Sequence, residues 1–167
     1  MIYEIFYTIF PSIIVLSLIV VVALFFGNVD KSILLKSFFA GIILVLPALL
    51  LIKALNIIIS ITLNSILPLA VISILSISIE ELLKYLTIKK IKGDLILIPI
   101  LVGGGFAISE TLYYSIGYRE LALYRSFTSL PIHIITSIIL YVGIKKDNRI
   151  YILLSILIHF TYNYFIH

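Results

Sequence analysis

The stretch ILSISIEELLKYLTIKK, residues 74–90, is apolar along most of its length, yet it carries Glu80, Glu81 and Lys84 near its centre. A run of this composition is typical of a helix in lipid, where an ionised side chain is costly to bury. Charged groups in such a helix are expected to face other helices or a water-filled cavity. The stretch therefore predicts a bundle of membrane helices with a polar interior.

The whole chain has the composition of a membrane protein. Of its 167 residues, 62% are hydrophobic and 12% are charged, and the mean hydropathy is +1.26. We therefore predict an all-α, polytopic integral membrane protein with one transmembrane domain over residues 1–167. The absence of cysteine excludes disulfides and thiolate chemistry. Basic residues at helix ends explain the net charge of +4, so we expect membrane lipids as partners and no nucleic acid.

Segments of about 20 mostly apolar residues are long enough to cross a bilayer. Six such segments are predicted, over residues 5–26, 33–54, 66–88, 95–116, 121–143 and 150–166. The first is expected to be a span rather than a signal peptide, because Glu4 is the only charged residue before it. Residues 56–65 are expected either to extend the third helix outward or to lie at the membrane interface.

The basic residues predict how this bundle is oriented. With six spans, the first, third and fifth loops lie on one side of the membrane, and most Lys and Arg residues lie in or beside them. Nine are on that side and three on the other: Lys31, Lys36, Lys84, Lys89, Lys90, Lys92, Lys145, Lys146 and Arg149 against Lys53, Arg119 and Arg125. Because basic loops remain in the cytoplasm, we expect a multi-pass protein of the cell membrane with both termini outside the cytoplasm.

Five ionisable residues lie well inside the predicted spans. They are the neighbours Glu80 and Glu81, which share one helix, and Glu110, His133 and His159 on three others. At about 1.5 Å of rise per residue, they fall in one broad layer, about 10 to 22 Å from the cytoplasmic helix ends. Groups this costly to bury are expected to face one another around a single cavity.

Simpler explanations apply to single polar residues. Glu80 and Lys84 are four residues apart and could form an ion pair, which leaves Glu81 unexplained because it points about 100° away around the helix. Arg125 is expected to extend toward the outer interface. Asn163 is expected to hydrogen-bond a neighbouring helix.

The glycines of VGGGFAIS, residues 102–109, have two interpretations. Small residues allow two helix backbones to approach closely, which is the simpler one. They could also leave room for an extended substrate backbone beside Glu110.

Carboxylates and imidazoles together suit a divalent cation, and zinc is the first candidate. Glu110, His133 and His159 are the candidate ligands, and Glu80 or Glu81 is the candidate general base that takes a proton from the bound water. A metal-free alternative is also open, in which a glutamate activates the water while His and Asn side chains stabilise the oxyanion.

Two motifs resemble those of a known family. EELLK, residues 80–84, resembles the E-E-x-x-K motif of the PrsW-type intramembrane proteases. FAISETLYY, residues 106–114, is similar to their second motif, F-x-x-x-E-x-x-x-Y, with Phe106, Glu110 and Tyr114 at the corresponding places. The motifs occur in the family's order on successive predicted spans.

The later histidines extend the resemblance to about half of the chain. His133 and His159 match the family's histidines, and HFTYN, residues 159–163, is similar to the H-x-x-x-N of the wider superfamily that contains the CAAX prenyl-endopeptidases. The resemblance implies a glutamate- and histidine-dependent, metal-assisted intramembrane protease that acts on membrane-associated proteins, as PrsW proteins are implicated in cleaving anti-sigma factors. The CAAX branch has His where this chain has Glu110, which favours the PrsW branch.

Two other functions remain open. A proton- or ion-coupled transporter also uses chains of Glu and His at mid-membrane depth, and a non-catalytic scaffold of the same fold could bind a peptide. In the protease, Glu80 and Glu81 should not be interchangeable, since both cannot face the same water equally. Lys84 could pair with either of them, and we favour Glu80 as the base.

Overall fold

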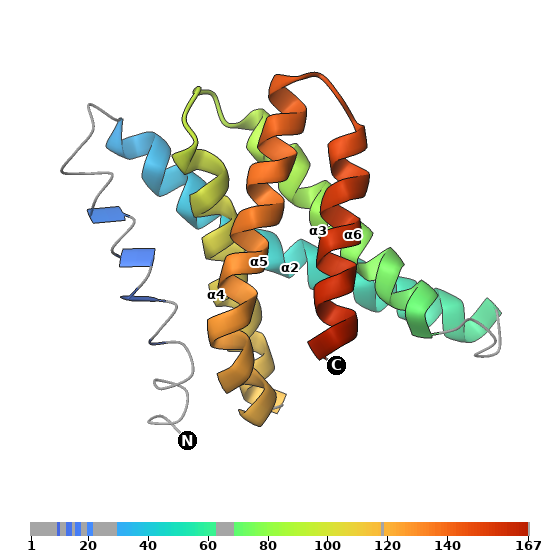
Figure 1. The fold of residues 1–167 in the computed structure, drawn as a ribbon. Coiled ribbons are helices and arrows are strands. Elements are labelled where there is room, and N and C mark those ends of the chain that lie inside the picture. Colours follow the sequence, from blue (N-terminus) through green and yellow to red (C-terminus); the bar gives the residue numbers. More distant parts are fainter. Residues whose placement is uncertain are drawn as a thin grey trace.

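The computed structural model describes five α-helices and no strand in the described part of the chain. They are α2 (Lys31–Thr62), α3 (Leu69–Lys90), α4 (Leu97–Gly117), α5 (Arg119–Lys145) and α6 (Ile150–Ile166), shown in Figure 1. The described residues are 10, 13, 14, 16, 17, 20, 21, 30–62, 69–117 and 119–166, and the side chains at 61, 62, 117, 119–123 and 166 are not described.

In the described part of the chain, three helices are long and apolar enough to cross a membrane. These are Lys31–Ser60 in α2, Leu97–Ile116 in α4 and Tyr124–Lys145 in α5. The apolar part of α6, Ile150–Phe165, is shorter. Helix α3 is as long as α4 but carries several charged residues. The prediction of an all-α chain is therefore confirmed for the described residues, and three of the helices are candidate membrane spans.

Four predicted spans match described helices to within a few residues at each end. The predicted span 5–26 lies outside the described residues apart from seven scattered positions. The largest difference concerns residues 56–62, which continue α2 instead of extending the third helix. No glycine or proline interrupts residues 54–62, so nothing in the local sequence ends α2 before that point.

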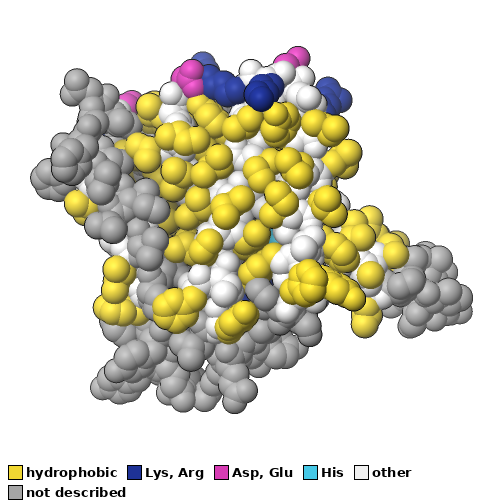
Figure 2. All heavy atoms as spheres, in the orientation of Figure 1, with side chains coloured by type: hydrophobic (Ala, Val, Ile, Leu, Met, Phe, Trp, Pro, Cys, Tyr) yellow, Lys and Arg dark blue, Asp and Glu magenta, His cyan; other side chains and the backbone are white. Residues whose placement is uncertain are grey.

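The loops rich in basic residues lie at one edge of the molecule. The start of α2, the connection between α3 and α4 and the connection between α5 and α6 are all at the top in Figure 1. Dark blue Lys and Arg side chains gather there in Figure 2, above a wide band of yellow apolar side chains. Asp30 accepts a hydrogen bond from the Ser32 amide (2.8 Å) at the start of α2. Asn148 does the same for Ile150 (3.0 Å) at the start of α6.

We call this side the lysine-rich edge, after the basic residues around residues 31, 89–92 and 145–149. Two of the basic residues counted in the orientation argument, Lys84 and Arg125, are fully buried in the interior instead. Without them, eight of the counted basic residues remain on this side and two on the other.

Helix α4 lies between α2 and α5, and its glycines explain how closely the three helices pack. A Cβ atom on Gly103 would meet the carbonyl oxygen of His133 on α5, and one on Gly105 would meet the carbonyl oxygen of Phe38 on α2. Gly41 on α2 faces the carbonyl of Val102 in the same way. These glycines therefore serve close helix packing. The alternative, that they leave room for a substrate, is not supported, because neighbouring helices already fill the space.

Candidate active site

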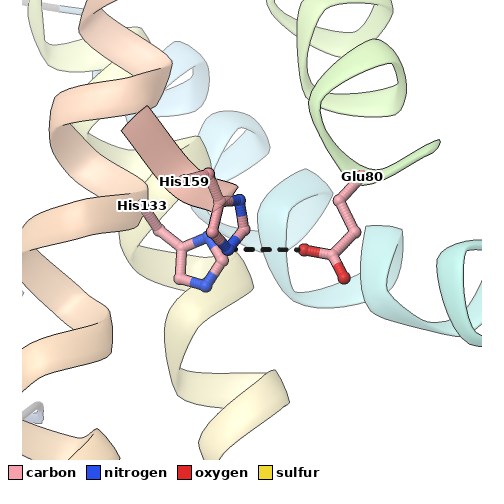
Figure 3. A group of neighbouring side chains, drawn as sticks. All are labelled: Glu80, His133 and His159. Atoms are coloured by element: carbon pink, nitrogen blue, oxygen red, sulfur yellow. Dashed lines mark ion pairs between the residues drawn. The ribbon is translucent and has the colours of Figure 1, made fainter. Parts of the chain in front are cut away.

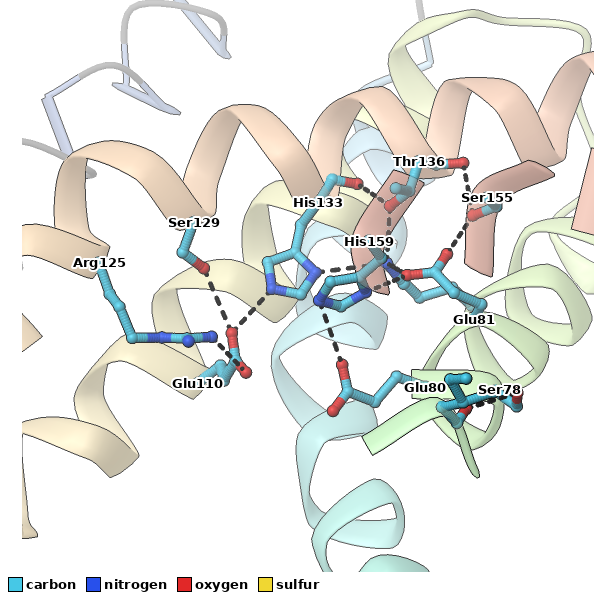
Figure 4. Close-up of polar contacts among 12 residues, drawn as sticks. Ser78, Glu80, Glu81, Glu110, Arg125, Ser129, His133, Thr136, Ser155 and His159 are labelled. Atoms are coloured by element: carbon cyan, nitrogen blue, oxygen red, sulfur yellow. Dashed lines mark hydrogen bonds and ion pairs between the residues drawn. The ribbon is translucent and has the colours of Figure 1, made fainter. Parts of the chain in front are cut away.

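The five ionisable residues predicted to lie inside the membrane come together in the interior, as Figure 4 shows. Helix α3 contributes Glu80 and Glu81, α4 contributes Glu110, α5 contributes His133 and α6 contributes His159. All are buried except Glu80, whose side chain keeps 12% of its surface exposed. Four helices thus place carboxylates and imidazoles in one cluster.

Glu81 is the closed end of this cluster. Its Oε1 atom accepts from the Lys84 ammonium at 2.5 Å and lies 2.7 Å from His159 Nδ1. The hydroxyl of Ser155 donates to Oε2 at 2.5 Å. Lys84, which the sequence allowed to pair with either glutamate, therefore pairs with Glu81. Because a carboxylate only accepts, His159 carries its proton on Nδ1 and directs Nε2 away from Glu81.

Glu110 is held in a similar way on the other side of the cluster. Arg125 Nη2 donates to Oε1 at 2.8 Å. Ser129 donates to Oε2 at 3.2 Å, and His133 Nε2 lies 2.7 Å from the same oxygen. The Arg125 guanidinium also lies 4.4 Å from the centre of the Tyr114 ring. The expectation that Arg125 extends to the outer interface is therefore wrong, because a buried carboxylate and an aromatic ring hold it inside.

His133 joins the two halves of the cluster. Its Nδ1 atom lies 3.3 Å from Lys84 Nζ, and Lys84 also donates to Thr136 Oγ1 at 2.9 Å. An ammonium group has no lone pair, so His133 Nδ1 must be the acceptor and Nε2 carries the proton that faces Glu110. Phe106, predicted to be a supporting residue, packs against His133 and Lys84. Its ring centre lies 4.9 Å from that of His133 and 5.4 Å from Lys84 Nζ.

Glu80 is the open end of the cluster. Its Oε2 atom is buried without a hydrogen-bond partner among the described residues, and so is His159 Nε2. The two atoms face each other at 3.9 Å, as the dashed line in Figure 3 shows. Two unpaired polar atoms at this position are costly in a protein interior. They are ready to bind a water molecule, an ion or a substrate group.

A cavity of about 670 Å³ lies beside this open end. Helices α2, α3, α4 and α6 line it, and Glu80, Glu110, Tyr114 and Asn163 contribute to its wall. Asn163 Oδ1 is also buried without a partner. We expected Asn163 to hydrogen-bond a neighbouring helix, but its Oδ1 accepts no hydrogen bond from the described residues. The side chain lines the cavity instead.

The residues that could hold a metal ion are Glu80, His133 and His159. One candidate ligand atom from each lies within 4.8 Å of the others. Glu110 is not in this group, and Glu80 takes the place that the sequence analysis gave to Glu110. A carboxylate with two imidazoles matches the ligand types of catalytic zinc sites, and two of the atoms are unpaired. Binding through His133 requires one of its nitrogens to leave Lys84 or Glu110.

Some site residues were missed by the sequence analysis. Ser155 precedes His159 by four residues and Ser129 precedes His133 by four, so each lies one helical turn from a histidine on the same face. Thr136 lies three residues after His133. These spacings were visible in the sequence, but hydroxyl residues are common in membrane helices and do not stand out as charges do.

No protein-family model, curated protein or solved structure matches this chain. Its function must therefore be argued from the geometry of the cluster and the cavity.

Proposed function

We propose that the protein is an intramembrane protease that hydrolyses peptide bonds of membrane-associated proteins. The observation that carries this proposal is the unpaired Glu80 Oε2, which faces the unpaired His159 Nε2 at 3.9 Å beside a cavity. The likeness of residues 80–84 and 106–114 to the PrsW motifs supports the same reaction. The lysine-rich edge supports a six-span bundle in the cell membrane with both termini outside the cytoplasm.

Glu80 acts as the general base in this proposal. A water molecule between Glu80 and His159 gives a proton to Glu80 Oε2 while its oxygen bonds to the carbonyl carbon of the substrate. The negative charge that forms on the carbonyl oxygen needs hydrogen-bond donors, and the Asn163 amide is the candidate at the cavity wall. The carbon–nitrogen bond then breaks, and Glu80 passes its proton to the leaving nitrogen.

The buried half of the cluster positions these groups. Glu81 fixes the tautomer of His159, so that Nε2 faces Glu80. Lys84 and Ser155 hold Glu81 in turn. This order of contacts follows the logic of a hydrolase triad, in which a carboxylate orients an imidazole that works from its other nitrogen.

Zinc or another divalent metal fits the donor set, with Glu80, His133 and His159 as the residues that would hold it, so that Glu80 would be a ligand in a metal-assisted reaction and the free base only in the metal-free one. When bound, such an ion would lower the pKa of a water molecule and polarise the substrate carbonyl. If His133 bound the ion through Nδ1, it would leave Lys84, and Arg125 and Glu110 would continue to hold Nε2 from outside this group.

A transporter is the second candidate, and one observation favours it. An unbroken series of contacts joins Arg125, Glu110, His133, Lys84, Glu81 and His159 across four helices. Proton relays in membrane proteins are built from such side chains. However, Glu80 is outside this series and lines the cavity with an oxygen that has no hydrogen-bond partner in the described residues, where a protease needs a base.

The decisive experiment is cleavage by purified protein in detergent, where no ion gradient exists. A peptide library analysed by mass spectrometry should show products with the wild type and none with the Glu80→Gln variant. Metal content measured on the same preparation, with and without a chelator, separates the metal-assisted from the metal-free reaction. Proton flux in liposomes with no cleavage in detergent would instead establish the transporter.

A further inference from the structure

One face of α3 carries a line of polar groups along the cavity wall. Ser73, Ser76 and Glu80 all line the cavity and are spaced by three and four residues, which places them on one side of the helix. Ser73 is exposed and Ser76 is half-buried. We call these three residues the polar strip.

The hydroxyls of the polar strip differ from other hydroxyls in the membrane helices. Several Ser and Thr side chains donate to a carbonyl of their own helix three or four residues earlier, which satisfies them without any partner. Examples are Ser37, Ser60, Ser78, Ser115 and Thr161. Within the described part of the chain, Ser73 and Ser76 have no hydrogen-bond partner.

A second helix at the cavity has its own unpaired group. Asn163 on α6 lines the cavity, and its buried Oδ1 has no partner in the described residues. Much of the remaining wall is apolar, with Val45, Ala48 and Leu49 of α2 among its residues. The cavity thus offers hydrogen-bonding groups from two helices, α3 and α6, on an otherwise largely apolar surface.

An unwound peptide segment needs this arrangement. A helical segment in lipid satisfies its own backbone, whereas a segment that unwinds exposes N–H and C=O groups that lipid cannot satisfy. The polar strip from residue 73 to residue 80 is about 10 Å long at the rise of a helix, which equals about three residues of extended peptide. Its hydroxyls can both donate and accept, so they suit either backbone group.

We propose that Ser73 and Ser76, together with Asn163 of α6, bind the backbone of an unwound, extended segment of the substrate and lead it to Glu80. This inference rests on the proposed function and adds a substrate class to it. The preferred substrates are membrane-embedded segments that unwind easily, as those interrupted by Gly or Pro do.

The test measures peptide binding without requiring cleavage. Two fluorescent 20-residue peptides are compared in detergent, one a continuous Leu/Ala helix and the other the same sequence with a central Gly-Pro pair. All proteins carry Glu80→Gln, so that bound peptide is not consumed. We expect the Ser73→Ala/Ser76→Ala variant to bind the Gly-Pro peptide at least about tenfold more weakly, and the continuous helix with unchanged affinity.

Two matched variants control for changes in the fold. Ser78→Ala removes a hydroxyl from the same helix that is bonded to the Ile74 carbonyl, and it should leave both affinities unchanged. Ser73→Thr/Ser76→Thr keeps both hydroxyls and should restore binding of the Gly-Pro peptide. Equal binding of the two peptides, or an equal loss in the Ser78→Ala variant, would overturn the proposal.

The same variants separate this inference from the proposed function. If the Gly-Pro peptide binds through the serines but wild-type protein never cleaves it, the polar strip stands and the protease proposal fails. If wild-type protein cleaves peptides and Ser73→Ala/Ser76→Ala leaves kcat/KM unchanged, the protease proposal stands and the polar strip fails.

Discussion

Glu80 and Glu81 are neighbours in the sequence, yet they have opposite surroundings. Glu81 is fully buried and is held by Lys84, Ser155 and His159. Glu80 lies at a cavity wall, and one of its oxygens has no partner among the described residues. A turn of about 100° per residue separates the two side chains. One residue type can therefore occupy two different environments on one helix, with Glu81 fully paired in the interior and Glu80 left with an unpaired oxygen at the cavity.

The largest effect on activity is expected at Glu80, the open end of the cluster. Glu80→Gln should lower kcat on a cleaved peptide by about 10²–10⁴-fold, the usual contribution of a general base. Because Glu80 Oε2 makes no hydrogen bond that would be lost, the thermal midpoint in detergent should stay close to that of the wild type. A variant that keeps full activity would break the comparison, since the two glutamates would then both be structural.

Substitution of Glu81, the closed end of the cluster, should by contrast lower the stability of the protein. Glu81→Gln leaves the Lys84 ammonium buried without its counter-charge, which typically costs about 3–5 kcal/mol. We expect a matching drop in the free energy of unfolding in detergent. The control is the double variant Glu81→Gln/Lys84→Met, which removes both charges and should recover part of the loss. If the double variant loses as much free energy of unfolding as Glu81→Gln and Lys84→Met lose in sum, the two side chains are not coupled.

A backbone contact near His133 gives a smaller effect. Gly103→Ala would place a methyl group against the His133 carbonyl oxygen, which is part of the rigid α5 backbone. Overpacking of this kind costs about 1–3 kcal/mol, and it should also reduce activity by shifting His133. Gly104→Ala is the matched control, because its methyl group would meet the end of the flexible Leu16 side chain. Equal effects of the two substitutions would show that the α4–α5 approach does not set the position of His133.

The smallest effect is expected at the lysine-rich edge, where an ion pair is exposed. Asp94 lies 2.5 Å from Lys145 Nζ and accepts from the Tyr141 hydroxyl. The hydrogen bond from Lys145, followed by that from Tyr141, lowers the pKa of the Asp94 carboxyl. A lowered pKa means that the contribution to stability is present above the unfolded-state pKa and is lost as the pH falls through the folded-state pKa.

Asp94→Asn should therefore change the thermal midpoint little at neutral pH, and the difference from the wild type should vanish in acid. Salt should weaken the pair because both side chains are exposed. If Asp94→Asn lowered stability as much as Glu81→Gln does, burial would not determine how much an ion pair contributes to stability.

The sequence predicted the members of the cluster better than their contacts. Glu110 and His159 stand out because an ionisable residue in an apolar run is rare and costly. The choice of Lys84 between two glutamates could not be predicted, since both are within reach on one helix. That choice follows from Ser155 and His159, which approach from α6 on the side of Glu81.

The error at Arg125 has a similar cause. Its predicted span began at residue 121, which placed the guanidinium near the membrane surface. Helix α5 begins at Arg119, so that Arg125 lies about 9 Å inside the helix at the usual rise. At that depth its long side chain meets Glu110 and Tyr114. Only the packing of α4 against α5 reveals this contact, and the sequence of one helix does not show which helix packs against it.

The length of α2 has a consequence for the surrounding bilayer. Its apolar part covers 30 residues, or about 45 Å of helix, against about 30 Å of hydrocarbon. Figure 1 shows α2 inclined steeply across α5 and α6. A helix that exceeds the hydrocarbon thickness must tilt or thicken the lipid around it, and each adjustment has an energetic cost. Since α2 also lines the cavity, we expect the acyl-chain length of the host membrane to affect a wall of the cavity.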